Sequence, residues 1–363
     1  MEKPIISITQ GDTNGVGLEI ILKTFENEDM VDICTPVIYG SPKIATYHRK
    51  QIGSQTTFVV RDSYSHIQAH TVNMLNPFGE EEIKIELGQP TAESGAAALR
   101  SLVSALKDMR DGNGEMLVTA PLSRTNIQKD FPGTTQLVEK ALGKGNKALN
   151  ILVHDDLRVA LATTNIPLSS VKEQITKENI AEKLETLSST LKRDFMIDNP
   201  RIAILSLNPL CSEEEPLGNE ENEIIKPTID EEFEKGIRCF GPYSVDKIFG
   251  SNEYQKFDAI LAMYHDQGMA PFKTLCSEGG VNIVAGLPVI VVTPLIGTDY
   301  ANAGKNITNE AALREALYTA IDVQRNRIRF DEMHQNPLKR QYFEKHDDSD
   351  KLKLDKVTED DEL

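Results

Sequence analysis

Short apolar runs alternate with longer amphipathic stretches along most of this chain, and this alternation constrains the fold more than any other feature of the sequence. Residues 4–9, for example, form an apolar run, and a glycine-rich turn separates it from an amphipathic stretch at 19–25. A short apolar run is typical of a buried strand, whereas apolar residues at helical spacing are typical of a helix packed on a sheet. The alternation therefore predicts an α/β fold with a mostly parallel sheet.

The same patterns locate the other expected elements. Further strands are expected at 36–39, 115–119, 201–207, 258–264, 281–285 and 288–293, and further helices at 92–109, 177–194, 220–235 and 309–326. The runs 149–153 and 158–163 flank a short polar turn, which predicts a hairpin and hence one antiparallel pair in the sheet. After about residue 329 the chain turns polar, and we interpret 344–363, where Asp, Glu and Lys dominate, as a solvated helix or a disordered extension.

The amino-acid composition and the net charge disfavour several classes of binding partner. The 363 residues carry 39 Lys and Arg against 56 Asp and Glu, a net charge of −17, so nucleic acid and anionic membranes are poor partners. No apolar run approaches a membrane span, and the first residues do not resemble a signal peptide. The cysteines are scattered without a CxxC pair, at Cys34, Cys211, Cys239 and Cys276. This spacing argues against a disulfide framework or a structural zinc site and favours the reducing cytoplasm.

Polar segments that contain Gly or Pro follow the predicted strands. They lie at 10–17, 120–124, 164–167, 208–218, 265–273 and 294–304. In open α/β sheets, ligands bind beyond the carboxyl ends of the strands. The placement of these segments therefore predicts a small-molecule site at the strand ends without identifying its chemistry.

Each candidate within these segments leaves two interpretations open. The segment 10–17 could hold an anion on backbone amides at a helix start, or it could be only a tight turn. His265 could ligate a metal while Asp266 fixes its tautomer, or it could be a hydrogen-bonded histidine at the start of a loop. Lys273 could bind a phosphate or carboxylate, or be solvated. We interpret His154 as structural and assign no role to His48, His66, His70, His334 and His346.

A series of short motifs occurs in order along the chain. They read ITQGD at 8–12, GVGLE at 15–19, VTAPLS at 118–123, FPG at 131–133, LRVALATT at 157–164, LNP at 207–209, GNEE at 218–221, AMYHDQG at 262–268, VNI at 281–283 and GLP at 286–288. Together they resemble the 4-hydroxythreonine-4-phosphate dehydrogenase (PdxA) family of vitamin B6 biosynthesis. The resemblance covers nearly the whole chain up to about residue 329.

The resemblance implies a fold and a reaction. The fold would be two α/β/α domains of the isocitrate and isopropylmalate dehydrogenase type, with the active site in the cleft between them and a homodimer as the working form. The expected domains are 1–120 plus 285–330 on the cofactor side and 121–284 for substrate and dimerisation, with an acidic extension at 331–363. The family oxidises the small phosphorylated hydroxy-amino acid 4-phosphooxy-L-threonine with NAD or NADP, and the resulting β-keto acid loses CO₂. A divalent metal such as Zn or Mg, held by three histidines from both subunits, polarises the hydroxyl.

The chain departs from the family at the expected metal ligands. Only the third histidine is present, as His265, whereas Asn165 and Leu210 occupy the other two positions. An asparagine offers one weak oxygen ligand and a leucine offers none.

The remaining site residues are also carried over from the resemblance. The expected catalytic residues are Asp246, Asp266 and Lys273, the expected substrate-binding residues are Thr134, Thr135, Lys273 and Asn282, and the expected cofactor-binding residues are Gly297, Thr298, Ala303 and Gly304. Here too the chain departs from the family. Its Gly-His-Thr-Glu motif reads GTTQ at 133–136, an expected arginine is Val291, and an expected Asp-His pair is LI at 295–296.

Three hypotheses follow. The main one is the family dehydrogenase, with a metal held in a rearranged way by His265, Asp266 and a residue of 211–215. The second is a metal-independent oxidoreductase with another substrate. The third is a catalytically impaired family member with a binding or regulatory role.

Overall fold

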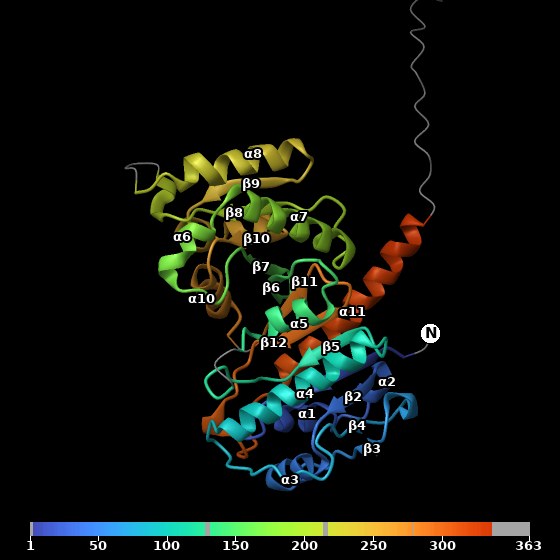
Figure 1. The fold of residues 1–363 in the computed structure, drawn as a ribbon. Helices are drawn as coiled ribbons and strands as arrows, with labels where there is room; N and C mark the ends of the chain where they lie inside the picture. Colours follow the sequence, from blue (N-terminus) through green and yellow to red (C-terminus); the bar gives the residue numbers. More distant parts are fainter. Residues whose placement is uncertain (1–2, 128–130, 213–216, 278, 336–363) are drawn as a thin grey trace, which may run out of the picture.

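The computed structural model describes residues 3–127, 131–212, 217–277 and 279–335 of the chain (Figure 1). Within these ranges, twelve strands form one sheet in the order β3-β4-β2-β1-β5-β12-β11-β6-β7-β10-β8-β9. The predicted α/β class is confirmed. The expected acidic tail lies almost wholly outside the described residues, which end at 335.

One half of the sheet is parallel throughout. Its strands are β1 (Ile5–Thr9), β2 (Thr35–Tyr39), β3 (Val59–Arg61), β4 (Asn73–Leu75), β5 (Met116–Thr119) and β12 (Ile290–Pro294). Each pairs in parallel with its neighbours in this half. The short strands β3 and β4 escaped the sequence analysis, because runs of three residues carry little periodicity.

The other half contains a reversal. Its strands are β6 (Leu149–His154), β7 (Leu157–Leu161), β8 (Ile202–Leu205), β9 (Cys239–Tyr243), β10 (Ala259–Ala262) and β11 (Val281–Ala285). β11 runs antiparallel to both β12 and β6, and β6 forms with β7 the predicted antiparallel hairpin. β7, β10, β8 and β9 are again parallel to one another.

This reversal brings the carboxyl ends of the two halves toward each other. β1 and β10 are six neighbours apart in the sheet, and rotation by roughly 20–25° per strand accumulates to about 130°. Because the strand direction also reverses, the carboxyl ends of β1 and β10 point within about 50° of one another. Figure 1 shows the two lobes that result, with β6, β11 and β12 between them. One sheet runs through both lobes, so the domain boundaries at 120 and 285 stay a prediction.

Eleven α-helices within the described residues pack around the sheet. They are α1 (Gly17–Thr24), α2 (Met30–Ile33), α3 (Pro42–Ile52), α4 (Ala92–Arg110), α5 (Thr134–Leu142), α6 (Val171–Gln174), α7 (Lys177–Arg193), α8 (Lys226–Glu234), α9 (Val245–Gly250), α10 (His265–Leu275) and α11 (Ala311–His334). The helices predicted from periodicity are confirmed as elements. α11 continues past its predicted end at 326, and a π-helical turn at Glu221–Ile225 precedes α8.

The alternative that placed His265 at the start of a loop was wrong. Residues 265–273 belong to α10, although the helix contains Gly268 and Pro271. Gly268 is needed for packing, because a Cβ atom there would lie 2.6 Å from Leu161 Cδ2. Gly268 allows α10 to pack closely on β7, but a glycine in the sequence is also typical of a loop.

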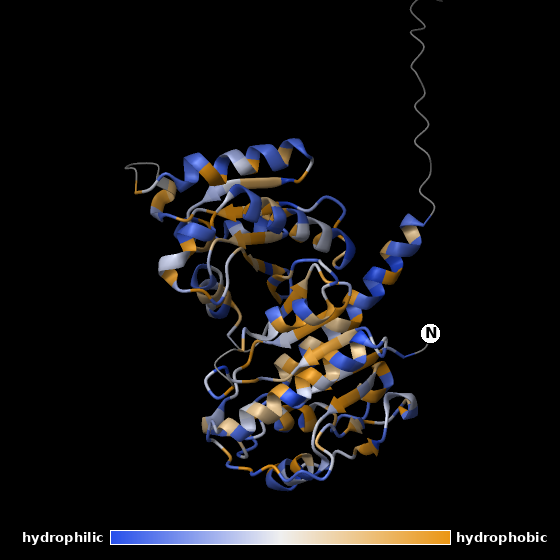
Figure 2. Ribbon diagram, viewed as in Figure 1, coloured by the Kyte–Doolittle hydropathy of each residue, from blue (hydrophilic) through white to orange (hydrophobic). Residues whose placement is uncertain are grey.

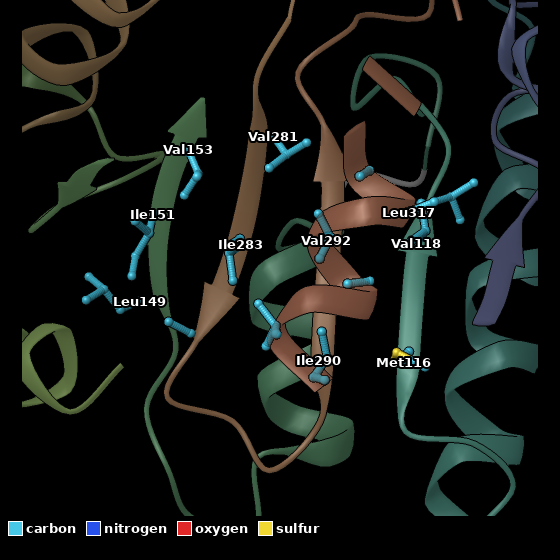
Figure 3. Close-up of a cluster of buried hydrophobic side chains, with 14 of the residues drawn as sticks. Met116, Val118, Leu149, Ile151, Val153, Val281, Ile283, Ile290, Val292 and Leu317 are labelled. Carbon is cyan, nitrogen blue, oxygen red and sulfur yellow. The ribbon is translucent and has the colours of Figure 1, made fainter. Parts of the chain in front are cut away.

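The core follows the strands. Figure 2 shows apolar strands inside and hydrophilic helix surfaces outside. In Figure 3, alternate side chains of neighbouring strands, such as Val118, Val292 and Ile283, point to one face, where Leu317 of α11 packs on them. None of the helices in the described ranges has both the length and the hydropathy needed to cross a bilayer.

A buried ion pair joins α11 to the end of α7. Arg327 donates from Nε and Nη2 to the two carboxylate oxygens of Asp194, at 2.7 and 2.8 Å. Their side chains are 11% and 3% exposed. Arg193 makes a pair of similar geometry with Asp331, at 3.1 and 2.7 Å, but those side chains are 40% and 53% exposed. The two pairs differ mainly in solvation.

We therefore expect Arg327→Met to lower the free energy of unfolding by about 3–5 kcal/mol, because it leaves the Asp194 carboxylate buried without its partner. Arg193→Met, the matched control, should lower it by less than about 1 kcal/mol. Urea denaturation followed by circular dichroism measures both. Equal losses of unfolding free energy in the two variants would contradict the conclusion that burial makes the Arg327–Asp194 pair more important to stability.

Candidate active site

Three neighbouring parallel strands bring the expected metal-ligand positions to one edge of the sheet. Asn165 follows β7, His265 follows β10 and Leu210 follows β8, and β10 pairs with both of the other strands. Gln267, 6% exposed, fixes this edge. Its Oε1 accepts a hydrogen bond from Met263 N and its Nε2 donates to the Ser206 carbonyl, both at 2.7 Å. The sequence resemblance therefore identified three positions that the fold does bring together.

The side chains at these positions do not fit a divalent metal. The Leu210 side chain is aliphatic and 51% exposed, and Asn165 adopts φ 55°, a left-handed conformation that asparagine tolerates. His265 Nδ1 lies 2.8 Å from Asp266 Oδ1. A catalytic zinc site requires about three nitrogen, sulfur or oxygen ligands from the protein. The part of the chain that the structure describes contains no group of three or more His, Cys, Asp or Glu side chains that could share a metal ion.

The rearranged site built from His265, Asp266 and a residue of 211–215 stays a prediction. Residues 213–216 lie outside the described ranges, so this alternative ligand set is only partly within them.

Buried carboxylates hold the chain around Leu210 in place. Glu221 accepts hydrogen bonds from the amides of Leu207 and Asn208, at 2.9 and 2.7 Å. Glu220 accepts one from Asn208 Nδ2 at 2.8 Å. The hydrogen bond from Lys172, followed by the one from Asn208, lowers the pKa of Glu220 to about 2. The framework of the edge is therefore tightly connected, although the residue it presents cannot coordinate a metal.

A pocket of about 280 Å³ opens beside this edge. It is lined by Leu168, Val171, Lys172, Leu207, Asn208, Leu217, Gly218, Glu220 and Tyr264. Apolar side chains stand exposed around it, with Leu168 73%, Leu217 52% and Ile166 38% exposed. The edge thus has an apolar rim where the family resemblance implied a cation.

The expected catalytic residues lie at different distances from this edge. Lys273 of α10 donates from Nζ to the Leu295 carbonyl beyond β12 and so connects the two lobes; burial lowers its pKa. Asp266 is exposed beside His265. Asp246 lies in the first turn of α9, which follows β9, and it accepts a hydrogen bond from Ser244. In the sheet, β9 is two strands away from β10. The hydrogen bond from Ser244 lowers the pKa of Asp246. Lys273 is therefore the residue of this set that reaches the other lobe.

A row of polar side chains crosses the centre of the sheet. Asn282 of β11 and Thr135 of α5 both donate to Asn150 Oδ1, each at 2.9 Å. In the next strands, Thr293 is the register partner of Asn282, and its hydroxyl lies 2.7 Å from that of Thr119. The structure thus brings together Thr135 and Asn282 from the predicted substrate set. The sequence analysis missed Asn150, Thr119 and Thr293, although a polar residue inside an apolar strand is a usable signal.

Two buried hydrogen-bond acceptors in and beside this polar row are unpaired among the described residues. Asn282 Oδ1 and Gln136 Oε1 are buried without a hydrogen-bond partner among the described residues. Thr134 begins α5 directly after Gly133, and a Cβ atom on Gly133 would lie 2.7 Å from Gln136 Oε1. Val291, at the position of the expected arginine, is fully buried in the core. The row therefore offers neutral hydrogen-bonding groups in place of a guanidinium.

The expected cofactor residues lie in the segment after β12, which rests on the β1–α1 turn. Val16 N donates to the Thr298 carbonyl at 3.0 Å, and Gly304 N donates to Glu19 Oε2 at 2.9 Å. Gly304 adopts φ 78°, and Gly297 is exposed. Ala303 N donates to the Tyr300 carbonyl at 3.4 Å.

The backbone amides of the 10–17 segment are used within the protein. Asp12 N donates to Pro121 O, Asn14 N to Asp12 Oδ1, and Gly15 N to Asp12 O. With Val16 N bound to Thr298, four amides are already partnered. The tight-turn interpretation is therefore favoured over anion binding.

One histidine is buried and another is half-buried. His48, to which the sequence analysis assigned no role, is fully buried and lies 2.8 Å through Nε2 from the Thr13 carbonyl. His154 Nδ1 lies 2.8 Å from Glu315 Oε1, which agrees with a structural role.

Known proteins resemble this chain over most of its length. The family model described as "Pyridoxal phosphate biosynthetic protein PdxA" matches residues 32–320. A Bacteroides thetaiotaomicron protein named 4-hydroxythreonine-4-phosphate dehydrogenase is 51% identical over 358 residues, 98% of each chain. One from Sulfurihydrogenibium with the same name is 37% identical, over 89% of this chain and 99% of its own.

A solved structure is similar as well. The crystal structure of a 4-hydroxythreonine-4-phosphate dehydrogenase from Burkholderia phymatum is 28% identical, with a TM-score of 0.70, over 89% of this chain and 99% of its own. The match extends through both lobes and the strand ends described above. This chain therefore belongs to the PdxA family.

Proposed function

We propose that this protein is an NAD- or NADP-dependent dehydrogenase that oxidises 4-phosphooxy-L-threonine, with decarboxylation, in pyridoxal 5′-phosphate biosynthesis. The observation that carries the proposal is the 51% identity, over 98% of both chains, to a relative named 4-hydroxythreonine-4-phosphate dehydrogenase. The aligned region includes nearly every residue of this chain.

The reaction assigns roles to the residues already placed. Oxidation of a secondary alcohol transfers a hydride to the nicotinamide and releases the hydroxyl proton, after which the β-keto acid loses CO₂. We assign substrate contacts to Thr134, Thr135 and Asn282, since Thr135 and Asn282 converge on Asn150. Asp246 and Asp266 are assigned as carboxylates that accept protons.

Lys273 has the strongest physical case for a substrate contact. Its ammonium group supplies the positive charge that attracts a phosphate or carboxylate. Its Nζ extends from α10 to the Leu295 carbonyl, directly after β12. Gly297, Thr298, Ala303 and Gly304 in that segment are assigned to the dinucleotide. These roles put the cofactor on the lobe that contains β1 and the substrate between the centre of the sheet and α10.

A specific observation favours a second candidate. Leu210 cannot replace an imidazole, so the implied divalent metal has no matching ligand set among the described residues. The second candidate is a metal-independent or catalytically impaired paralogue with another substrate or a binding role. No step of the proposed reaction is therefore assigned to a metal.

A homodimer in the cytoplasm is part of the proposal. The exposed side chains of Ile166, Leu168, Leu210 and Leu217 support it, because large exposed apolar patches commonly mark interaction surfaces. Sedimentation velocity measures the oligomeric state.

The proposed activity predicts that purified protein with 4-phosphooxy-L-threonine and NAD or NADP produces the reduced nucleotide, followed by absorbance at 340 nm. If the chain works without a metal, the rate should persist in EDTA. A rate that appears only with added Zn²⁺ or Mg²⁺ would contradict metal independence. No reduction with either nucleotide would favour the binding role.

Metal binding can be measured apart from turnover. We expect less than about 0.1 equivalent of zinc per chain after dialysis against Zn²⁺ and mass spectrometric metal analysis, because a single imidazole is too few ligands. Asn165→His combined with Leu210→His should raise the zinc content substantially. The same variant with His265→Ala is the control and should lose this gain. One equivalent of zinc per chain in the unchanged protein would contradict the conclusion that these side chains do not fit a divalent metal.

The role of Lys273 is tested by Lys273→Met. Loss of one charged hydrogen bond to the substrate should lower kcat/KM by between about tenfold and a hundredfold. Lys107→Met, at an exposed position on α4, is the matched control and should leave kcat/KM unchanged. Steady-state kinetics with saturating nucleotide measures both. An unchanged kcat/KM in Lys273→Met would remove Lys273 from the site.

A further inference from the structure

The β1–α1 segment supports the segment 297–304 through contacts at both ends. Val16 N binds the Thr298 carbonyl, and Glu19 Oε2 accepts a hydrogen bond from Gly304 N. Gly15 makes the first contact possible, because a Cβ atom there would lie 2.6 Å from the Thr298 oxygen. A third contact lies between these two and depends on a charge.

That charge is the carboxylate of Asp12, which is 1% exposed. Its Oδ2 accepts three hydrogen bonds, from Ser94 Oγ at 3.1 Å, Asn126 Nδ2 at 2.8 Å and Tyr300 OH at 2.9 Å. Its Oδ1 accepts the Asn14 amide at 2.9 Å. The four donors come from the β1–α1 turn, α4, the segment after β5 and the segment after β12.

The acceptor geometry of a carboxylate matches this set of partners. All four neighbouring groups donate to Asp12, and a carboxylate provides acceptors on both oxygens. An asparagine would turn an NH₂ group toward donors on one side. The hydroxyl of Tyr300 also accepts a hydrogen bond from Asn126 Nδ2 at 3.4 Å, so it connects the segments after β1, β5 and β12.

We infer that Asp12 is a positioning residue for the dinucleotide: its buried carboxylate, through Tyr300 and Asn126, sets the conformation of the segment 297–304. Asp12 need not touch the cofactor. The inference rests on the proposed cofactor role of Gly297, Thr298, Ala303 and Gly304. It also gives a role to the glycine-rich segment 10–17, whose backbone amides already have partners within the protein.

The test compares Asp12→Asn and Tyr300→Phe with the control Tyr47→Phe, which changes a tyrosine 42% exposed on α3. Tyr300→Phe removes one hydroxyl and leaves the other three donors to Asp12 in place, so it remains informative if Asp12→Asn does not fold. Three measurements apply to each: hydrogen exchange of peptides covering 297–304 without nucleotide, the Kd for NADH by fluorescence titration, and the steady-state parameters for NAD.

Faster exchange is expected in 297–304 for Asp12→Asn and Tyr300→Phe, with exchange in α7 unchanged. The Kd for NADH and the KM for NAD should rise by about tenfold or more in Asp12→Asn, with a much smaller change in kcat. Tyr47→Phe should match the unchanged protein.

Unchanged exchange in 297–304, or loss of stability throughout with an unchanged KM for NAD, would overturn the inference. Failure of the unchanged protein to bind NADH or NADPH would overturn the proposed function and the effect on affinity together. The exchange measurement would then still decide whether Asp12 holds the segment, so the two failures are distinguishable.

Discussion

One reversal of strand direction at the centre of the sheet determines how the two lobes can work together. β11 runs antiparallel to both β12 and β6, which leaves those two strands parallel to each other. The antiparallel β6–β7 hairpin then reverses β7, β10, β8 and β9 relative to β1. Without the reversal, twist alone would leave the carboxyl ends of β1 and β10 about 130° apart. With it, the segments after β12 and at α10 approach, and Lys273 can donate to the Leu295 carbonyl. A shared site between the lobes depends on this geometry.

Buried carboxylates then fix the segments that the strands present. Asp12 holds the turn after β1 to the segment after β12, Glu221 holds the amides after β8, and Asp194 holds α11 through Arg327. Each binds donors from parts of the chain distant in sequence, which is how a buried charge is tolerated. The framework around the strand ends is therefore well connected, including at Asn165 and Leu210, which occupy two of the expected metal-ligand positions.

Much of the fold and part of the site were predictable. Strands such as Val281–Ala285 and helices such as Lys177–Arg193 carry strong periodicity, and the motifs placed Asn165, Leu210 and His265 at one edge. α10 was misjudged because Gly268 and Pro271 look like loop residues, while the tertiary packing on Leu161 requires the glycine. The role of Asp12 was missed since its partners lie 2, 82, 114 and 288 residues away along the chain. Local patterns cannot report such contacts.

The amino-acid sequence by itself determined the α/β class and the family, because these depend on local periodicity and on residue identity at short motifs. Only the tertiary structure decided that β11 pairs antiparallel with both β12 and β6, that Asn282 and Thr135 share Asn150, and that Asp12 supports the segment 297–304. The physical reason is that hydrogen bonds and close packing form between segments distant in sequence, and the geometry of those pairings exists only once the chain has folded.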